Sequence, residues 1–332
     1  MHKETKTTSA EKAPNSASRA SNEMLKHTPV LLNEMLAQLF PKNGKVYVDA
    51  TFGAGGYSRA ILNSADCKVI ALDRDPSVIS IAQDFSREYG SRFFFNLSKF
   101  SDIKNMLNCE VSGIVFDFGL SSMQIEDGKR GFSFQHDGPL DMRMGNDGDL
   151  TAAQVANSFS KDDLRSILRL YGEERLAGRV ASAIVASRPL SSTFQLAEVV
   201  RAVVPRRGTI DPATKTFQAL RIFVNNELQE IHSALNGILS FASGGLNDIS
   251  VVTVAFHSLE DMVVKNWLKS NSGMVKEKTR GVILPSNQEI ANNHRARSAR
   301  LRSLVVRAIV GQGRAPKEKN TNCNIPEGKI ER

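Results

Sequence analysis

47-YVDATFGAGGYSRAIL-62 joins a strand-like run to a helix-like run through a turn with glycines at 53, 55 and 56. The run before the turn is apolar and β-branched and ends near an acid, Asp49. A strand, a glycine turn and a helix in this order form the ligand-binding end of many parallel sheets. The stretch therefore predicts an α/β fold with a ligand at the glycine turn.

Phosphate ligands fit this turn poorly. A P-loop requires Lys and then Ser or Thr directly after its glycines, and neither follows here. A dinucleotide fingerprint that starts at Gly53 requires Gly or Ala at position 58, where the chain has Ser58. Asp49 would repel a pyrophosphate but attract a cation. The turn favours S-adenosylmethionine, which carries an ammonium, a sulfonium and no phosphate, and whose amino-acid end the glycine backbone can approach closely.

Two further acids end strand-like runs. Asp73 in 71-ALDRDP-76 follows Gly55 by 18 residues, close to where a βαβ unit places an acid on a ribose diol, and Asp75 is a weaker competitor. Asp117 ends the run in 115-VFDFGLSS-122. Because ligands of open α/β sheets bind outside the carboxyl ends of the strands, Asp49, Asp73 and Asp117 are expected to converge on one crevice.

Apolar runs of this kind alternate with helical stretches along the chain. Strands are predicted at 45–50, 68–73, 92–97, 112–119 and 248–256, with two more at 280–285 and 301–310. Near-continuous apolar strands separated by helices indicate a parallel sheet that is covered on both faces. The fold class is thus α/β, of the Rossmann-like kind.

The alternation stops between Gly119 and the fifth strand, where no strand is expected. Helices are predicted there at 161–171, 173–187 and 194–204, so an all-helical domain is inserted into the sheet. One long helix, from Phe217 to Ile238, then leads back to the sheet. Near the N-terminus, Thr28-Pro29 predicts the cap and first residue of a helix.

These features divide the chain into five segments. They are a disordered N-terminal extension (1–26), a first part of the sheet domain (27–125), the helical insertion (126–212), a second part of the sheet domain (213–312) and a flexible basic tail (313–332). The extension lacks the apolar region of a secretory signal, and no apolar run approaches a membrane span. Three scattered cysteines without a CxxC pair indicate neither a disulfide scaffold nor a cysteine zinc site, and they suit a reducing cytoplasm. No metal site is expected.

Over about residues 24–312 the sequence resembles the bacterial RsmH (MraW) family of rRNA cytosine-N4 methyltransferases. Nine blocks in order carry the resemblance: 27-HTPVLLNE-34, 49-DATFGAGGYS-58, 72-LDRDP-76, 115-VFDFGLSS-122, 130-RGFSFQHDGPLDMRM-144, 171-YGEER-175, 212-PATKTFQALRIFVNNEL-228, 256-FHSLED-261 and 295-RARSARLR-302. A weak glycine motif alone could mislead, but nine ordered blocks make a chance match very improbable.

The resemblance implies a class I methyltransferase fold with a helical insertion and S-adenosylmethionine as methyl donor. It also implies a substrate, the N4 of a cytosine in the decoding region of 16S rRNA within the small ribosomal subunit, in the cytoplasm. The family's donor-site pattern corresponds to Gly55, Gly56, Tyr57, Asp73, Phe100, Asp117 and Gln124. The chain departs from the family at Tyr57, where histidine is common, and at Ala255 and Met262. A side-chain contact at Tyr57 is therefore in doubt, although backbone contact is compatible.

Methyl transfer to an amine is an in-line displacement, so catalysis rests largely on positioning and desolvation. The cytosine amine is a poor nucleophile because its lone pair is shared with the ring, and a hydrogen-bond acceptor helps to expose that pair. Many amino-methyltransferases carry D/N-P-P-Y/F after the fourth strand, whereas this chain has 117-DFGL-120. Two roles stay open for Asp117: it receives the amine as a catalytic residue, or it only binds the cofactor. His257 is a second candidate base, although a histidine at a strand end more often orders a loop.

The net charge of +8 is unevenly placed, with nine Lys or Arg and two acids between Met274 and Arg314. Such a segment favours contact with a phosphate backbone, although a solvated surface explains the charge equally well. Arg295 and Arg297 are candidate RNA-binding residues in this segment, and Arg143 is one at the entry to the insertion. Phe132 and Phe134 could stack a flipped base or anchor the insertion.

Three other functions are compatible with parts of the sequence. A nicotinamide oxidoreductase shares the sheet, but Ser58 and the basic segment disfavour it. A DNA or other RNA amino-methyltransferase is the nearest enzyme alternative, and the missing D-P-P-Y motif argues against the DNA-modifying class. A ribosome-assembly protein could retain the donor fold without catalysis, although the intact glycines and Asp73 favour a working site.

Overall fold

The computed structural model describes residues 29–308, except 108, 147, 207, 245 and 246. The predicted N-terminal extension (1–26) and tail (313–332) lie outside these residues. One seven-stranded sheet has the order β3-β2-β1-β4-β5-β7-β6. The strands are β1 (Val46–Asp49), β2 (Lys68–Asp73), β3 (Phe93–Leu97), β4 (Gly113–Asp117), β5 (Ile249–Ala255), β6 (Val275–Glu277) and β7 (Arg300–Val306). The helices are α2 (Leu32–Leu39), α3 (Gly56–Ser64), α4 (Ile79–Tyr89), α5 (Ile103–Met106), α6 (Ser122–Glu126), α7 (Ala152–Ser158), α8 (Lys161–Tyr171), α9 (Ala177–Ala186), α10 (Thr193–Val203), α11 (Thr214–Asn225), α12 (Glu227–Ala242), α13 (Ser258–Ser270) and α14 (Asn287–Asn292).

The first five strands are parallel and confirm the predicted strands within one or two residues at their ends. β7 then pairs antiparallel with β5, and β6 pairs antiparallel with β7. The strand predicted at 280–285 is wrong, since only an isolated bridge between Ile283 and Leu301 forms there. The short strand β6 lies just before that stretch.

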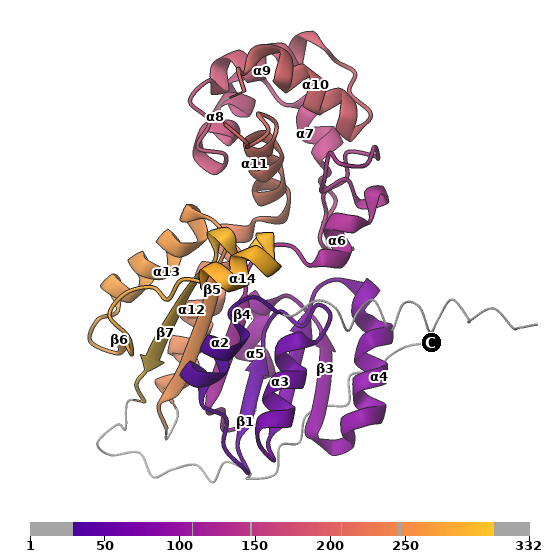
Figure 1. The fold of residues 1–332 in the computed structure, drawn as a ribbon. Coiled ribbons are helices and arrows are strands. Elements are labelled where there is room, and N and C mark those ends of the chain that lie inside the picture. The colour runs from indigo at the N-terminus through magenta and orange to yellow at the C-terminus, as the bar shows by residue number, and fades with distance from the viewer. Residues whose placement is uncertain (1–28, 108, 147, 207, 245–246, 309–332) are drawn as a thin grey trace, which may run out of the picture.

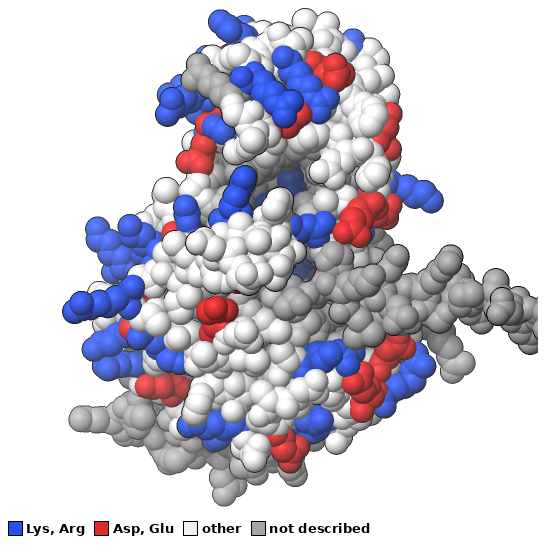
Figure 2. Space-filling view, in the orientation of Figure 1, with Lys and Arg blue, Asp and Glu red and all other residues white. Residues whose placement is uncertain are grey.

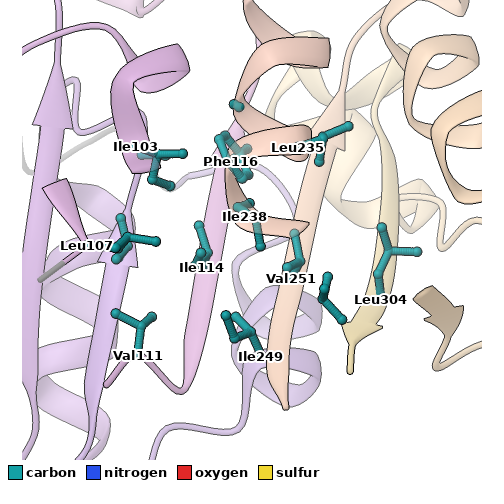
Figure 3. Close-up of a cluster of buried hydrophobic side chains, with 14 of the residues drawn as sticks. Ile103, Leu107, Val111, Ile114, Phe116, Leu235, Ile238, Ile249, Val251 and Leu304 are labelled. Carbon is teal, nitrogen blue, oxygen red and sulfur yellow. The ribbon is translucent and has the colours of Figure 1, made fainter. Parts of the chain in front are cut away.

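Helices cover both faces of the sheet (Figure 1). Because side chains alternate along a strand, Ile114 and Phe116 of β4 face one side and Val115 faces the other. The first side packs against α5, α12 and α13, with Leu235 and Ile238 of α12 close to β4 and β5 (Figure 3). The second side packs against α2, α3 and α4. The sheet therefore sits between two apolar layers.

A third apolar cluster lies apart from the sheet. Its buried residues come from α7 to α11 and from the segment between Phe132 and Met144. Figure 1 shows these helices as a separate lobe that is joined to the sheet through α6 and α11. Among the described residues between β4 and β5 no strand forms, as the sequence predicted. Since Phe217 and Leu220 of α11 belong to this cluster, we propose that the insertion extends to Asn225 rather than ending at 212.

Three helix predictions need correction. The first described helix begins at Leu32, after Leu31 in a left-handed conformation, so Pro29 is not its first residue. The long helix expected from Phe217 to Ile238 is two helices, because Asn226 adopts a left-handed conformation and ends α11. α9 begins at Ala177 rather than 173, after Glu173 in another left-handed conformation. Such local backbone reversals have no signal in hydrophobic periodicity.

Within the described residues, no helix combines the length and apolarity that crossing a membrane requires.

Candidate active site

Asp49, at the end of β1, holds the glycine turn through hydrogen bonds. Its side chain is fully buried, and its two oxygens accept hydrogen bonds from the Ser58 amide (3.1 Å) and hydroxyl (2.7 Å) and from the Thr51 amide (3.2 Å). Burial raises its pKa to about 6 despite these bonds. Asp49 therefore holds the start of α3 in place and adds negative charge beneath the turn, and Ser58 has a structural partner that explains its position.

The three turn glycines have different surroundings. A Cβ on Gly55 would lie 2.4 Å from Cζ of Phe85, and a Cβ on Gly56 would lie 2.2 Å from Cγ of Pro29. These two glycines are thus required by packing inside the protein. Gly53, with φ of +52°, has no atom closer than 3.8 Å to such a Cβ, so its open side is the one that a ligand can approach. The sequence predicted a close approach of the ligand at all three glycines, whereas the family resemblance pointed only to Gly55 and Gly56.

Tyr57 points away from the turn. Its side chain is 4% exposed, and its hydroxyl donates a hydrogen bond to the carbonyl of Val30, next to α2. Burial raises the pKa of this phenol well above its usual value, so it stays protonated. The Tyr57 side chain therefore faces the segment before α2, and only its backbone borders the turn.

Asp73, at the end of β2, lies beside the glycine turn. Its oxygens accept hydrogen bonds from the Gly53 amide (2.8 Å) and the Asp75 amide (2.9 Å). Burial raises its pKa to about 6. Each carboxylate oxygen accepts more than one hydrogen bond, so Asp73 retains capacity for the hydroxyls of a ribose.

Asp75 and Gln124 form a buried polar network with Arg130. The Gln124 amide donates to Asp75 (2.7 Å), its oxygen accepts from the Ser121 amide (3.0 Å), and Arg130 contacts Asp75 at 3.0 Å. Burial alone would raise the pKa of Asp75, but the Ser77 amide, Gln124 and Arg130 outweigh it and hold it below the usual value. Gln124, expected at the donor site, is thus engaged on both ends of its amide and acts by fixing the loop after β4.

Asp117 ends β4 next to the same turn. Its amide donates to the Thr51 hydroxyl (2.7 Å), while Oδ1 of its side chain is buried and has no hydrogen-bond partner among the described residues. Burial, with the charges of Asp49 and Glu260, raises its pKa well above the usual value. A buried carboxyl oxygen without a partner beside another acid is a place where a positively charged ligand group would be favourable.

An aromatic wall continues from Asp117. Phe100, in the 3-10 turn η3 (Phe100–Asp102), lies 5.8 Å from Phe116 and 6.1 Å from Phe118 between ring centres. Phe100 and Phe118 line a narrow pocket together with Arg74, Gly119, Met144 and Glu260. The pocket lies at the carboxyl edge of the sheet, where residues that follow β2, β4 and β5 meet.

A charged cluster borders this pocket on its other side. Arg221 of α11 forms two hydrogen bonds of 2.8 Å with Glu227 and lies 3.9 Å from Glu260, and His257 Nε2 lies 3.1 Å from Glu260. Carboxylate oxygens of Glu227 and Glu260 and a ring nitrogen of His257 lie within 4.8 Å of one another, a spacing at which three such groups could hold a metal ion. The Arg221 guanidinium pairs with Glu227, whereas Oε1 of Glu260 has no hydrogen-bond partner among the described residues. His257 caps α13 through the Glu260 amide, which matches a loop-ordering role.

The expected RNA-binding arginines differ in their partners. Arg143 forms two hydrogen bonds with Asp141 and one with the Gly148 carbonyl. Arg295, in the turn η5 (His294–Ser298), reaches Ser122 and Glu126 of α6. Arg297 is exposed and forms no ion pair within the described residues. Phe134 packs edge-to-face on Phe217, with ring centres 4.9 Å apart, which favours anchoring of the insertion.

The sheet has β7 antiparallel beside β5, and the glycine turn lies at the carboxyl ends of β1, β2 and β4. These two features define a class I methyltransferase, whose methyl donor is S-adenosylmethionine. The residues present fit that donor, because Asp117 offers a buried oxygen without a partner and Gly53 leaves the turn open.

The chain belongs to the MraW methylase family, whose model matches residues 24–307. A protein of Wolbachia sp. subsp. Drosophila simulans, named ribosomal RNA small subunit methyltransferase H, is 46% identical over 290 residues, which cover 84% of this chain and 98% of that protein. A protein of Neorickettsia sennetsu with the same name is 46% identical over 295 residues, covering 87% of this chain and 99% of its own.

Proposed function

We propose that this protein transfers a methyl group from S-adenosylmethionine to the exocyclic N4 of a cytosine in 16S rRNA, in the decoding region of the small ribosomal subunit. The family match over residues 24–307 carries the proposal, together with relatives at 46% identity whose name is ribosomal RNA small subunit methyltransferase H. This substrate makes the cytoplasm the location that we propose.

Three acids at neighbouring strand ends support our assignment of the donor-binding residues. Asp49, Asp73 and Asp117 end β1, β2 and β4, and burial raises the pKa of each. When bound, S-adenosylmethionine supplies an electrophilic methyl group on a sulfonium, next to an ammonium. We assign Asp117 and the open side of Gly53 to the amino-acid end, because Oδ1 of Asp117 has no hydrogen-bond partner among the described residues and no side chain crowds Gly53. Asp73 accepts the ribose hydroxyls.

The remaining donor-site residues act through backbone or shape. Gly55, Gly56 and Tyr57 border the donor with their backbone only, since their side-chain directions face the protein interior. We assign Phe100 to the adenine of the donor, because its ring belongs to an apolar wall with Phe116 and Phe118 beside the strand ends. Between its two open roles we thus assign Asp117 to cofactor binding.

Positive charge supports a path for RNA between the two lobes. Figure 2 shows Lys and Arg side chains around the recess that separates the helical insertion from the sheet domain. Arg295 contacts α6, which begins the connection to the insertion, so the basic segment and the neck of the insertion form one surface. We propose that Arg295 and Arg297 contact phosphates on this surface and that Arg143 shapes the loop at its edge.

Labelled methyl transfer tests this function. The purified full-length protein is incubated with labelled S-adenosylmethionine and small ribosomal subunits from a strain that lacks the enzyme, with large subunits and duplex DNA as controls. We expect label in 16S rRNA only. Label in DNA would favour a DNA amino-methyltransferase, and a protein that binds small subunits without transferring label would be a non-catalytic assembly factor.

A further inference from the structure

Glu260 is a buried carboxylate at the end of the pocket that Phe100 and Phe118 line. It is 1% exposed and lies in the first turn of α13, directly after β5. Its Oε2 accepts hydrogen bonds from the Phe256 amide (2.7 Å) and the His257 amide (3.2 Å), which fix the orientation of the carboxylate. A group held in this way is preorganised for a partner on its other oxygen.

That other oxygen, Oε1, has no hydrogen-bond partner among the described residues. His257 Nε2 lies 3.1 Å away but outside hydrogen-bond geometry, and a Cβ built on Gly119 would lie 3.8 Å from Oε1. Oε1 therefore lies beside the loop that follows Asp117, and Glu260 is one of the residues that line the pocket. A buried acceptor without a donor is costly, so a donor from a bound molecule is its natural partner.

The neighbouring charges keep Glu260 ready to accept. Arg221 forms both of its short ion-pair contacts with Glu227 and remains 3.9 Å from Glu260, so it compensates the charge of Glu260 without occupying Oε1. Burial alone would raise the pKa of Glu260, but His257, Arg221 and the Phe256 amide outweigh it and hold it below the usual value. Glu260 is thus ionised at neutral pH, whereas burial raises the pKa of Asp117 above its usual value.

We propose that Glu260 is a catalytic residue that accepts a hydrogen bond from the exocyclic amine of the target cytosine through Oε1 and then takes its proton. The proposal rests on the proposed function, since it assigns the amine-binding group of that same site. It separates two roles at neighbouring strand ends: Asp117 after β4 faces the donor, and Glu260 after β5 faces the acceptor.

The step balances without another reactant. The amine nitrogen forms a bond to the methyl carbon while the carbon–sulfur bond breaks, and the electron pair of that bond stays on sulfur as a thioether. The nitrogen then carries a positive charge and one proton too many. That proton passes to Oε1, which leaves a neutral methylamino group on the base and a neutral Glu260. Solvent removes the proton after the product leaves the pocket.

Two substitutions of Glu260 test the proposal in the full-length protein. Glu260→Gln keeps size and the acceptor for the Phe256 and His257 amides but removes the basic oxygen, whereas Glu260→Asp is shorter and keeps the charge. We expect single-turnover transfer to small subunits to fall about 10²–10⁴-fold in Glu260→Gln. Glu260→Asp retains more activity than Glu260→Gln, an order that a purely structural role would reverse.

The affinity for S-adenosylmethionine, measured by calorimetry, provides a readout apart from transfer. We expect it to stay within about threefold of wild type in both variants. The matched control is Glu174→Gln, which alters another buried glutamate that accepts a backbone amide at a helix start (Leu176 to Glu174, 2.8 Å) and leaves transfer unchanged.

If Glu260→Gln transfers methyl groups at a rate close to wild type, the role of Glu260 is refuted while the proposed function stands. The same holds if Glu260→Gln loses donor affinity as much as it loses transfer. A wild-type protein that labels no small-subunit RNA would overturn the proposed function and this inference with it.

Discussion

Replacing Gly55 with alanine tests whether this glycine is needed for packing or for ligand contact. Gly55 has φ of +78°, and the new Cβ would lie 2.4 Å from Cζ of Phe85. A side chain in the left-handed region costs about 1–2 kcal/mol, and an overpacked core costs about 1–3 kcal/mol more. We expect Gly55→Ala to lower the free energy of unfolding by about 2–5 kcal/mol in urea denaturation. The folded variant keeps its affinity for S-adenosylmethionine within about threefold.

Gly53→Ala is the matched control in the same turn. Its φ of +52° imposes similar strain, but no atom lies within 3.8 Å of the new Cβ. We expect a stability loss of about 1–2 kcal/mol together with weaker donor binding, because the methyl group occupies the open side of the turn. Equal stability losses for the two variants would refute the packing argument. So would a Gly55→Ala protein that is as stable as wild type but no longer binds the donor.

Three other predictions follow from the site. Tyr57→Phe leaves the Val30 carbonyl without its donor and lowers the free energy of unfolding by about 1–3 kcal/mol in urea denaturation; weaker donor binding without a stability loss would show that the hydroxyl serves the ligand. Burial raises the pKa of Asp73 to about 6, and the ionised carboxylate is the better acceptor for ribose hydroxyls. The affinity for S-adenosylmethionine, measured by calorimetry, therefore rises with pH through about 6 and then levels off. An affinity that does not change across this pH range contradicts the assignment of Asp73 to the ribose. Arg297→Ala lowers the slope of log affinity for 16S rRNA against log salt concentration by about 0.7–0.9, measured by filter binding. The control Arg87→Ala, on α4 and paired with Asp84, leaves this slope unchanged. An unaltered slope for Arg297→Ala would show that this residue does not contact the RNA.

The parallel part of the sheet could be predicted from the sequence, because each of its strands is a local apolar run that ends at a recognisable residue. Asp49, Asp73 and Asp117 could be placed at one edge for the same reason, since strand ends of a parallel sheet meet there. The edge strand β6 could not be predicted, because three residues carry no period. Nor could the break at Asn226, which depends on one residue's left-handed backbone.

The roles of individual site residues were harder to predict from the sequence, because they depend on contacts with residues that are distant in the chain. Gly55 and Gly56 are explained by Phe85 and Pro29, which no glycine motif reveals. Gln124 is engaged by Asp75, 49 residues away. The acidic residue of 256-FHSLED-261 that faces the pocket, Glu260, was visible in the sequence only as a helix-start acid, since its burial and unpartnered oxygen arise from packing against the loop after β4.

We propose that the site at the carboxyl edge of the sheet transfers a methyl group to the exocyclic amine of a cytosine. It is tested most directly by digesting the labelled 16S rRNA to nucleosides and identifying the labelled product by mass spectrometry against synthetic standards. We predict that the label is recovered as a cytidine methylated on N4. Label in a cytidine methylated on a ring carbon or on the ribose oxygen would contradict the account.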